Sequence, residues 1–149
     1  MTRMEKSIEI KASPEKVWQM LALDRLLEWV PGYERDLNSV EYTSEVHTIE
    51  DKLRVGATAH GIPKKKGEYN FEIMESLKNQ RMAYRLSGSL NVLVTSILEP
   101  VQQGTKFTYV YDYQMPWGIL GKVVEKLLIG QLKKESENSL ENLRSILEK

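Results

Sequence analysis

The stretch PWGILGKVVEKLLIGQLKKESENSLENLRSILEK, residues 116–149, decides the fold. Apolar residues recur in it at helical spacing, and Pro116 stands near the first turn, where a missing N–H costs least, so the stretch predicts one long helix. Its apolar stripe has two parts that face different directions, one from Trp117 to Leu132 and one from Leu140 to Leu147. The helix is therefore expected either to cross a curved surface or to bend, with Gly130 as the candidate bend.

The rest of the chain predicts strands joined by short turns. Glu5 to Lys11 alternates as a half-buried strand, and Ser13-Pro14 then supplies an N-cap and a first helical residue. A second short helix is expected from Asp24 to Trp29, stopped by Pro31-Gly32. Six further strands are predicted at residues 33–46, 55–62, 68–77, 81–86, 89–98 and 105–114. Their short connections require antiparallel neighbours, so an α+β fold follows: a curved antiparallel sheet with two short helices after the first strand and the long C-terminal helix over its concave face.

Composition narrows the class of protein. The 149 residues are expected to form a single domain, 1–149, and Lys plus Arg equals Asp plus Glu at 21 each. A neutral molecule lacks the overall field that draws in nucleic acid, so no nucleic-acid partner is expected. The absence of cysteine excludes disulfides and thiolate metal ligands. No apolar run is long enough to span a bilayer, which predicts no integral membrane segment and a cytoplasmic protein.

Motifs for metals and cofactors are missing. The two histidines, His47 and His60, match no metal-binding pattern, and the glycines form neither dinucleotide-binding nor phosphate-binding loops, so no metal and no cofactor are expected. Alternation with Thr58 places His60 on the inner face of the sheet, as a possible contact for a polar ligand group. The run Lys64-Lys65-Lys66 is typical of a solvated hairpin tip, with a small anion or membrane contact as the alternative.

Aromatic residues carry a stronger pattern. Phe107, Tyr109, Tyr111 and Tyr113 recur with period two and therefore share one face of a strand. Inward tyrosines give apolar walls with hydroxyls that need partners, which suits a cavity for a mostly apolar ligand. Spacing alone favours ordinary core packing, in which each hydroxyl reaches a protein group. Gln131, within the apolar stripe of the last helix, is interpreted either as a core residue or as a ligand contact.

The N-terminal part resembles a known family. The segments IEIKASPEKVW (8–18), LEW (27–29) with Pro31-Gly32, and VGAT (55–58) are similar to the polyketide cyclase/dehydrase branch of the START-like (SRPBCC, Bet v 1-like) superfamily. The resemblance implies a helix-grip fold, in which a seven-stranded antiparallel sheet wraps round the long C-terminal helix and leaves an apolar cavity. It therefore shifts the interpretation of the tyrosines from core packing to cavity lining, with Trp29 at the rim.

These observations lead to three hypotheses. The first is binding or transport of a hydrophobic small molecule, such as a lipid, isoprenoid or polycyclic metabolite, without chemistry. The second is a cyclase or dehydratase that uses His60 or a tyrosine as acid or base, and the third is a co-chaperone-like interaction module. No catalytic constellation is recognised. The expected cavity residues are Trp29, His60, Tyr69, Phe71, Tyr84, Tyr109, Tyr111, Trp117, Leu120, Val124, Leu127, Leu128 and Gln131.

Overall fold

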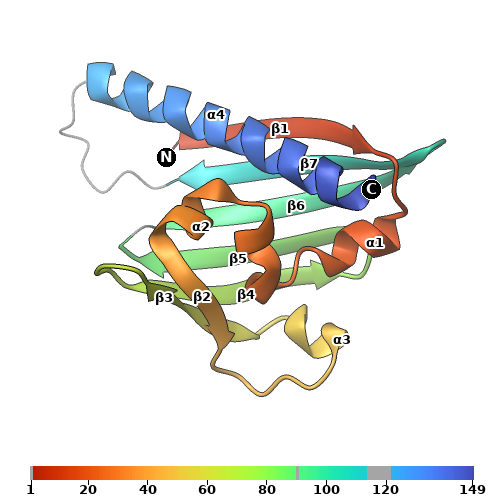
Figure 1. The fold of residues 1–149 in the computed structure, drawn as a ribbon, viewed down its shortest axis with the longest axis horizontal. Coiled ribbons are helices and arrows are strands. Elements are labelled where there is room, and N and C mark those ends of the chain that lie inside the picture. The colour runs from red at the N-terminus through yellow and green to blue at the C-terminus, as the bar shows by residue number, and fades with distance from the viewer. Residues whose placement is uncertain (1, 90, 114–121) are drawn as a thin grey trace.

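The computed structural model describes residues 2–89, 91–113 and 122–149. Its centre is a seven-stranded antiparallel sheet in the order β1-β7-β6-β5-β4-β3-β2 (Figure 1). The strands are β1 (Thr2–Ile10), β2 (Leu37–Tyr42), β3 (Thr58–Pro63), β4 (Tyr69–Leu77), β5 (Arg81–Gly88), β6 (Val92–Val101) and β7 (Gly104–Tyr113). Neighbours from β2 to β7 follow one another in the chain, as the short turns require, and β1 closes the order by pairing with β7.

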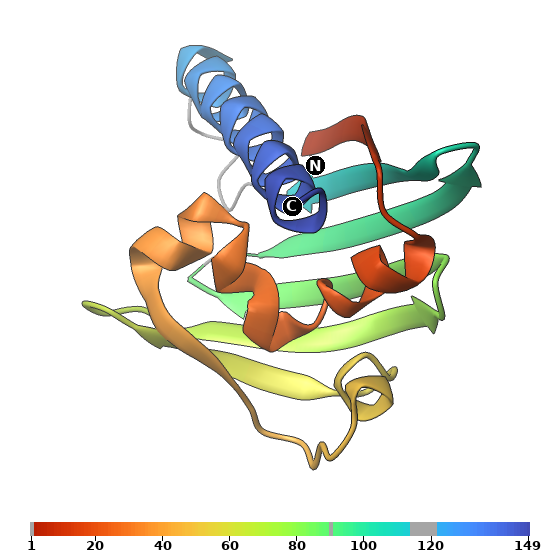
Figure 2. The same cartoon turned by 45° about the vertical axis from the view of Figure 1, so that its right-hand side comes forward.

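The helices lie mainly over the concave face of this sheet (Figures 1 and 2). They are α1 (Pro14–Gln19), the 3₁₀ helix η1 (Leu23–Glu28), α2 (Pro31–Asp36), α3 (Ile49–Lys52) and α4 (Lys122–Leu147). The hydroxyl of Ser13 caps α1 by accepting from the Lys16 N–H. Together, the curved sheet and the long helix make the helix-grip fold that the sequence predicts.

The long helix α4 is anchored through its carboxy-terminal half. Leu140 and Leu143 are buried, and Ile146 packs against the same core. Nearer the amino-terminal end, Leu127 is 70% exposed, and Figure 2 shows this end of α4 projecting beyond the sheet. The two parts of the apolar stripe therefore have different surroundings. None of the helices in the described residues 2–89, 91–113 and 122–149 is apolar over a length sufficient to cross a membrane.

Several element boundaries differ from the prediction. Pro31 starts α2 instead of ending the preceding helix, because proline fits the first helical turn, and the predicted strand at 33–46 therefore begins only at Leu37. The short helix α3 was not expected, although Thr48 and Asp51 form a reciprocal capping box at its start. Of the two alternatives expected for the long helix, the structure shows an unbroken α4 that passes through Gly130 and crosses the curved sheet (Figure 1).

The remaining differences lie in the strands. β6 extends to Val101, past the expected end at Leu98, and Pro100 pairs opposite Thr105 within the ladder to β7. A proline lowers the propensity for a central strand, but the residues on either side of Pro100 keep their pairing with β7. β3 begins at Thr58, three residues later than expected.

One glycine is required by the packing of the sheet. A Cβ at Gly61, in β3, would lie 2.7 Å from a methyl carbon of Leu37, which is 1% exposed. Without a side chain at Gly61, Leu37 fills the concave face above β3. This close contact leaves no room for a larger residue at position 61.

Candidate ligand-binding site

Four tyrosines bring their hydroxyls together on the concave face. The hydroxyl of Tyr33, from α2, lies 2.9 Å from that of Tyr84, from β5. The hydroxyls of Tyr109 and Tyr111, both from β7, lie 3.1 Å apart. The two pairs are adjacent, since Tyr84 and Tyr109 each affect the pKa of the other. We call these four residues the tyrosine row.

Apolar rings surround the tyrosine row. Trp29 lies 5.5 Å from Tyr109 between ring centroids, and Phe71 lies 5.8 Å from Tyr84. Phe107 meets Trp29 edge to face at 6.1 Å. Such tilted and edge-on contacts are the favoured geometries of aromatic pairs, so the hydroxyls stand in a tightly packed aromatic environment.

Trp29 itself is fixed by polar contacts. Its indole N–H donates to the carbonyl of Met20 at 3.0 Å, and its own carbonyl accepts from the Asn142 side chain of α4 at 3.3 Å. The segment after η1 is thereby tied to the end of α1 and to α4. Trp29 is 1% exposed, so it lies in the interior, whereas the sequence predicted a position at the rim.

Burial keeps these hydroxyls protonated. Desolvation raises the pKa of Tyr33, Tyr84 and Tyr109 well above its ordinary value, because the phenolate is disfavoured away from water. Desolvation also raises the pKa of Tyr111 to about 12, although its hydrogen bond with Tyr109 opposes the shift. At neutral pH the tyrosine row therefore offers O–H donors and no anionic base.

Other buried polar groups have the same chemistry. Among the described residues, those buried with polar side chains all carry hydroxyls: Thr95, Ser96, Thr105, Thr108, Ser136 and Ser139. The described part of the chain holds no group of three or more potential metal ligands. None of these six residues supplies a carboxylate or an imidazole that could move the protons of a ligand.

The tyrosine row reaches a partly exposed rim at Tyr111. This residue is half-buried, as are Tyr113 beside it on β7 and Tyr69 at the start of β4. Above the rim, Arg35 of α2 donates to Glu135 of α4 at 3.1 Å, and Glu135 contributes to the raised pKa of Tyr111. The ion pair thus joins two helices at the accessible end of the tyrosine row.

The structure brings together part of the predicted cavity set. Trp29, Phe71, Tyr84, Tyr109 and Tyr111 share the concave interior, and Tyr69 lies at its rim. Trp117 and Leu120 lie outside the described residues, and for Val124 and Leu128 the structure describes only the backbone, within α4.

Three of the predicted cavity residues are exposed. His60 is exposed and lies on the opposite face from its buried neighbours Ala59 and Gly61, because the strand alternation in β3 sets in at Thr58 with the opposite phase. Leu127 and Gln131 are exposed. They lie on the part of α4 that projects beyond the sheet, so neither faces an enclosed space among the described residues.

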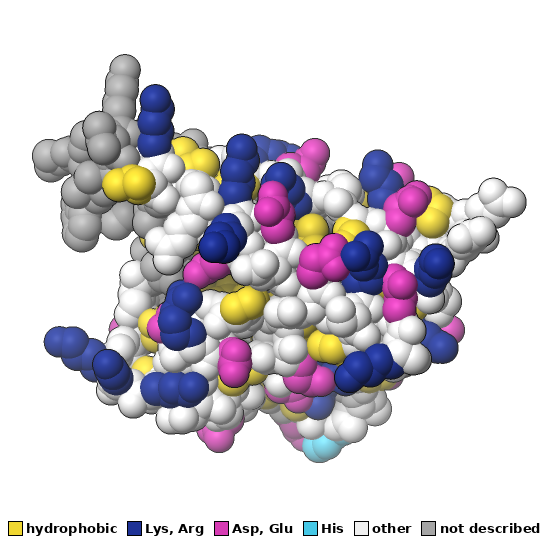
Figure 3. All heavy atoms as spheres, turned by 45° about the horizontal axis from the view of Figure 1, so that its top comes forward, with side chains coloured by type: hydrophobic (Ala, Val, Ile, Leu, Met, Phe, Trp, Pro, Cys, Tyr) yellow, Lys and Arg dark blue, Asp and Glu magenta, His cyan; other side chains and the backbone are white. Residues whose placement is uncertain are grey.

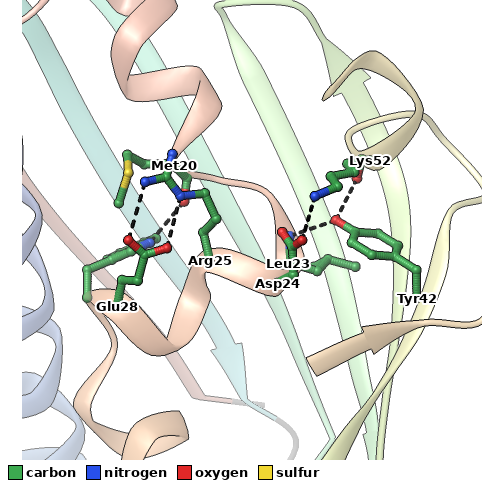
Figure 4. A network of polar contacts seen from close by, with 8 residues as sticks. Met20, Leu23, Asp24, Arg25, Glu28, Tyr42 and Lys52 are labelled. Atoms are coloured by element: carbon green, nitrogen blue, oxygen red, sulfur yellow. Dashed lines mark hydrogen bonds and ion pairs between the residues drawn. The ribbon is translucent and has the colours of Figure 1, made fainter. Parts of the chain in front are cut away.

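Sequence reasoning missed Tyr33 and a second polar network. Tyr33 was assigned to a strand, and only the reading of Pro31 as a helix start would have placed it over the sheet. In the second network, Tyr42 accepts from the Leu23 N–H at 3.0 Å and donates to the Lys52 carbonyl at 3.1 Å, while the Lys52 ammonium pairs with Asp24 at 2.6 Å (Figure 4). These bonds tie η1 to β2 and α3 and have a structural role.

Comparison with known proteins assigns the family. The sequence matches the family described as polyketide cyclase/dehydrase and lipid transport over residues 1–148. The chain belongs to this family. A comparison with curated proteins finds no match.

Several solved structures have a fold similar to that of this chain. A protein from Mesorhizobium loti has a TM-score of 0.72 at 19% identity, covering 99% of this chain and 97% of the other. Aha1 from Colwellia psychrerythraea, solved as a dimer, has a TM-score of 0.65 at 20% identity, with 99% and 96% covered. DynU16, from the dynemicin biosynthetic locus, has a TM-score of 0.67 at 15% identity, and the match covers 98% of this chain but 47% of DynU16. At these sequence identities, the similarity to the three structures concerns the fold alone.

Proposed function

We propose that this family member binds a mostly apolar small molecule, such as a lipid, an isoprenoid or a polycyclic metabolite, at the rim of the tyrosine row beneath α4. The observation that supports this proposal is the number of protons in the row. Four hydroxyls in an open row can form at most three hydrogen bonds among themselves, so at least one O–H is left to donate. Within the described residues no further acceptor for it is found, and a carbonyl or hydroxyl of a bound ligand supplies one.

The accessible end of the row defines where such a ligand sits. Tyr84 and Tyr109 are each 1% exposed, whereas Tyr111 and Tyr113 are half-buried. The ligand therefore lies against Tyr111, with its apolar part on the rings of β7 and its acceptor on the Tyr111 hydroxyl. When Tyr109 donates to Tyr111, the Tyr111 proton remains free to donate to the acceptor of the ligand.

Carriage is favoured over catalysis by the chemistry of the lining. A cyclase or dehydratase needs a positioned acid or base with a pKa near the working pH, and burial moves the tyrosine pKa values away from neutrality. His60, the other candidate base, lies on the convex face. The family description itself includes lipid transport beside cyclase and dehydrase activity.

The test uses two naphthalenes of the same size. 2-Acetylnaphthalene carries a carbonyl acceptor and 2-ethylnaphthalene does not, and their affinities are compared by displacement of Nile red. We expect the ketone to bind about threefold to tenfold tighter, the range of one net hydrogen bond. Tyr111→Phe should remove this preference, while Tyr42→Phe, which removes a hydroxyl bonded to Leu23 and Lys52 outside the row, should keep it. Equal affinity of the two compounds for the wild-type protein, or no binding of either, would overturn the proposal.

A further inference from the structure

A basic pocket lies at the same end of the molecule as the rim of the tyrosine row. It has a volume of about 740 Å³ and is lined by Arg35, Asp36, Lys64, Lys65, Lys66 and Tyr69. Four cationic side chains thus face one carboxylate, an excess of three positive charges in a chain with no net charge. Positively charged side chains gather at this edge in Figure 3, where Figure 1 places the turn between β3 and β4.

The charges of the three lysines are uncompensated. Arg35 is engaged by Glu135 at 3.1 Å and by Asp36 at 3.6 Å. Within the described ranges, Lys64, Lys65 and Lys66 form no ion pair with a carboxylate. The lysines therefore keep their charge available to an external anion, whereas Arg35 mainly holds α2 to α4.

The turn that carries the lysines has a fixed place. The Lys64 N–H donates to the Asp36 carbonyl at 3.0 Å, which ties the turn to the end of α2. At its other end, the Glu68 N–H donates to the Ser89 hydroxyl at 2.9 Å. Gly67 has a φ of +138°, and a Cβ there would lie 2.9 Å from the Tyr69 ring. A solvated hairpin tip needs none of these attachments, so the turn forms a wall of the pocket.

Tyr69 connects this pocket to the proposed ligand site. Its ring lines the basic pocket and also packs against the hydrophobic core. Tyr33, at the inner end of the tyrosine row, lies on the same short helix as Arg35 and Asp36. A ligand with an apolar body against the rim can therefore extend over Tyr69 toward the lysines.

We infer that this pocket binds an anionic group, a carboxylate or a phosphate, at one end of the apolar ligand. The inference rests on the proposed function and narrows it to amphipathic anions. Two sources share this chemistry: the charged end of a monomeric ligand, and a lipid headgroup that remains in a bilayer. Exposed charges of this kind attract an anion modestly and lose their effect at high salt.

The experiment compares dodecanoate with 1-dodecanol at pH 8 by displacement of Nile red. We expect the wild-type protein to bind dodecanoate about tenfold tighter, as three exposed ion pairs together allow. The triple variant Lys64→Gln, Lys65→Gln, Lys66→Gln should lose this preference and keep its affinity for 1-dodecanol. A matched variant, Lys16→Gln, Lys78→Gln, Lys106→Gln, removes three exposed lysines from the other end of the sheet and should retain the preference.

The outcomes separate the inference from the function on which it rests. Equal binding of dodecanoate and 1-dodecanol by the wild-type protein, or equal loss in both triple variants, would overturn the anion site and leave apolar binding intact. Failure of both compounds to bind would overturn the proposed function and the inference with it. Flotation with phosphatidylcholine vesicles, with and without phosphatidylglycerol, distinguishes the sources. Selective loss of phosphatidylglycerol binding in the Lys64–Lys66 variant assigns the anion to a bilayer headgroup, and a preference confined to dodecanoate assigns it to the ligand.

Discussion

The hydroxyl of Tyr33 in α2 lies 2.9 Å from that of Tyr84 in β5, 51 positions away in the sequence. Both side chains are buried, at 7% and 1% exposure. This contact joins a short helix to the centre of the sheet by a polar bond inside an apolar layer. It therefore contributes both to the position of α2 and to the chemistry of the site.

Removal of one hydroxyl of this pair should destabilise the protein. Tyr84→Phe leaves the buried Tyr33 hydroxyl with one partner fewer, and we expect the free energy of unfolding to fall by about 1 to 3 kcal/mol. The double variant Tyr33→Phe, Tyr84→Phe should cost less than the sum of the two single changes, because no orphaned hydroxyl remains. Urea unfolding of all four proteins measures this coupling. Strict additivity would show that the two hydroxyls do not interact.

Two leucines of α4 should differ sharply in their effect on stability. Leu143 is 0% exposed, so Leu143→Ala should lower the free energy of unfolding by about 2 to 5 kcal/mol. Leu127 is 70% exposed, and Leu127→Ala should change it by less than about 0.5 kcal/mol. Thermal unfolding monitored by circular dichroism makes the comparison. A similar loss in both variants would mean that the amino-terminal half of α4 is packed as firmly as the other half.

A glycine in the same helix offers a stabilising change. Gly130 is exposed, and a Cβ placed there would meet no atom within 4 Å. Gly130→Ala should therefore raise the free energy of unfolding by about 0.5 to 1 kcal/mol through its better helix propensity. The matched change Gly61→Ala should lower stability instead, since its Cβ would lie 2.7 Å from Leu37. A lower melting temperature for Gly130→Ala would contradict the continuous helix.

Alkaline pH should unfold the protein through the tyrosine row. The pKa of Tyr111 in the folded protein is raised to about 12 from an ordinary value of 10, so the unfolded chain loses its proton first as the pH rises. Stability is therefore complete below pH 10 and falls between pH 10 and 12, by about 1.4 kcal/mol per pH unit for each such tyrosine. Urea unfolding at a series of pH values, with phenolate absorbance as a second signal, tests this. Constant stability over the interval would mean that folding does not raise the pKa of Tyr111.

Most of the fold could be predicted from the sequence because its signals are local. Alternation in β4, β5 and β7 and the helical spacing after Lys122 each follow from side-chain periodicity. The wrong element boundaries arise where one residue fits two different local structures. Pro31 either ends one helix or begins another, and only the docking of Tyr33 onto Phe71 and Tyr84 selects the second.

The candidate site was predictable only in part. The period-two aromatics of β7 identified Tyr109 and Tyr111, whose inward direction follows from the strand alone. The sequence did not show which side chains of β3 point inward. Thr58 and His60 share one face and Ala59 and Gly61 the other, and neither pair is apolar enough to identify the inner face. Partners from distant segments, such as Tyr33 and Glu135, depend on tertiary packing that no local pattern encodes.

The unequal burial along α4 has a kinetic consequence. A helix held by Leu140 and Leu143 at one end opens locally with a smaller free energy at the other, so its backbone amides should exchange with deuterium at graded rates, slowest near the carboxy-terminal contacts. The amino-terminal half of α4 is therefore expected to open while the core contacts of Leu140 and Leu143 stay in place. Under the proposed function, such a local opening would admit or release the ligand at the rim without global unfolding.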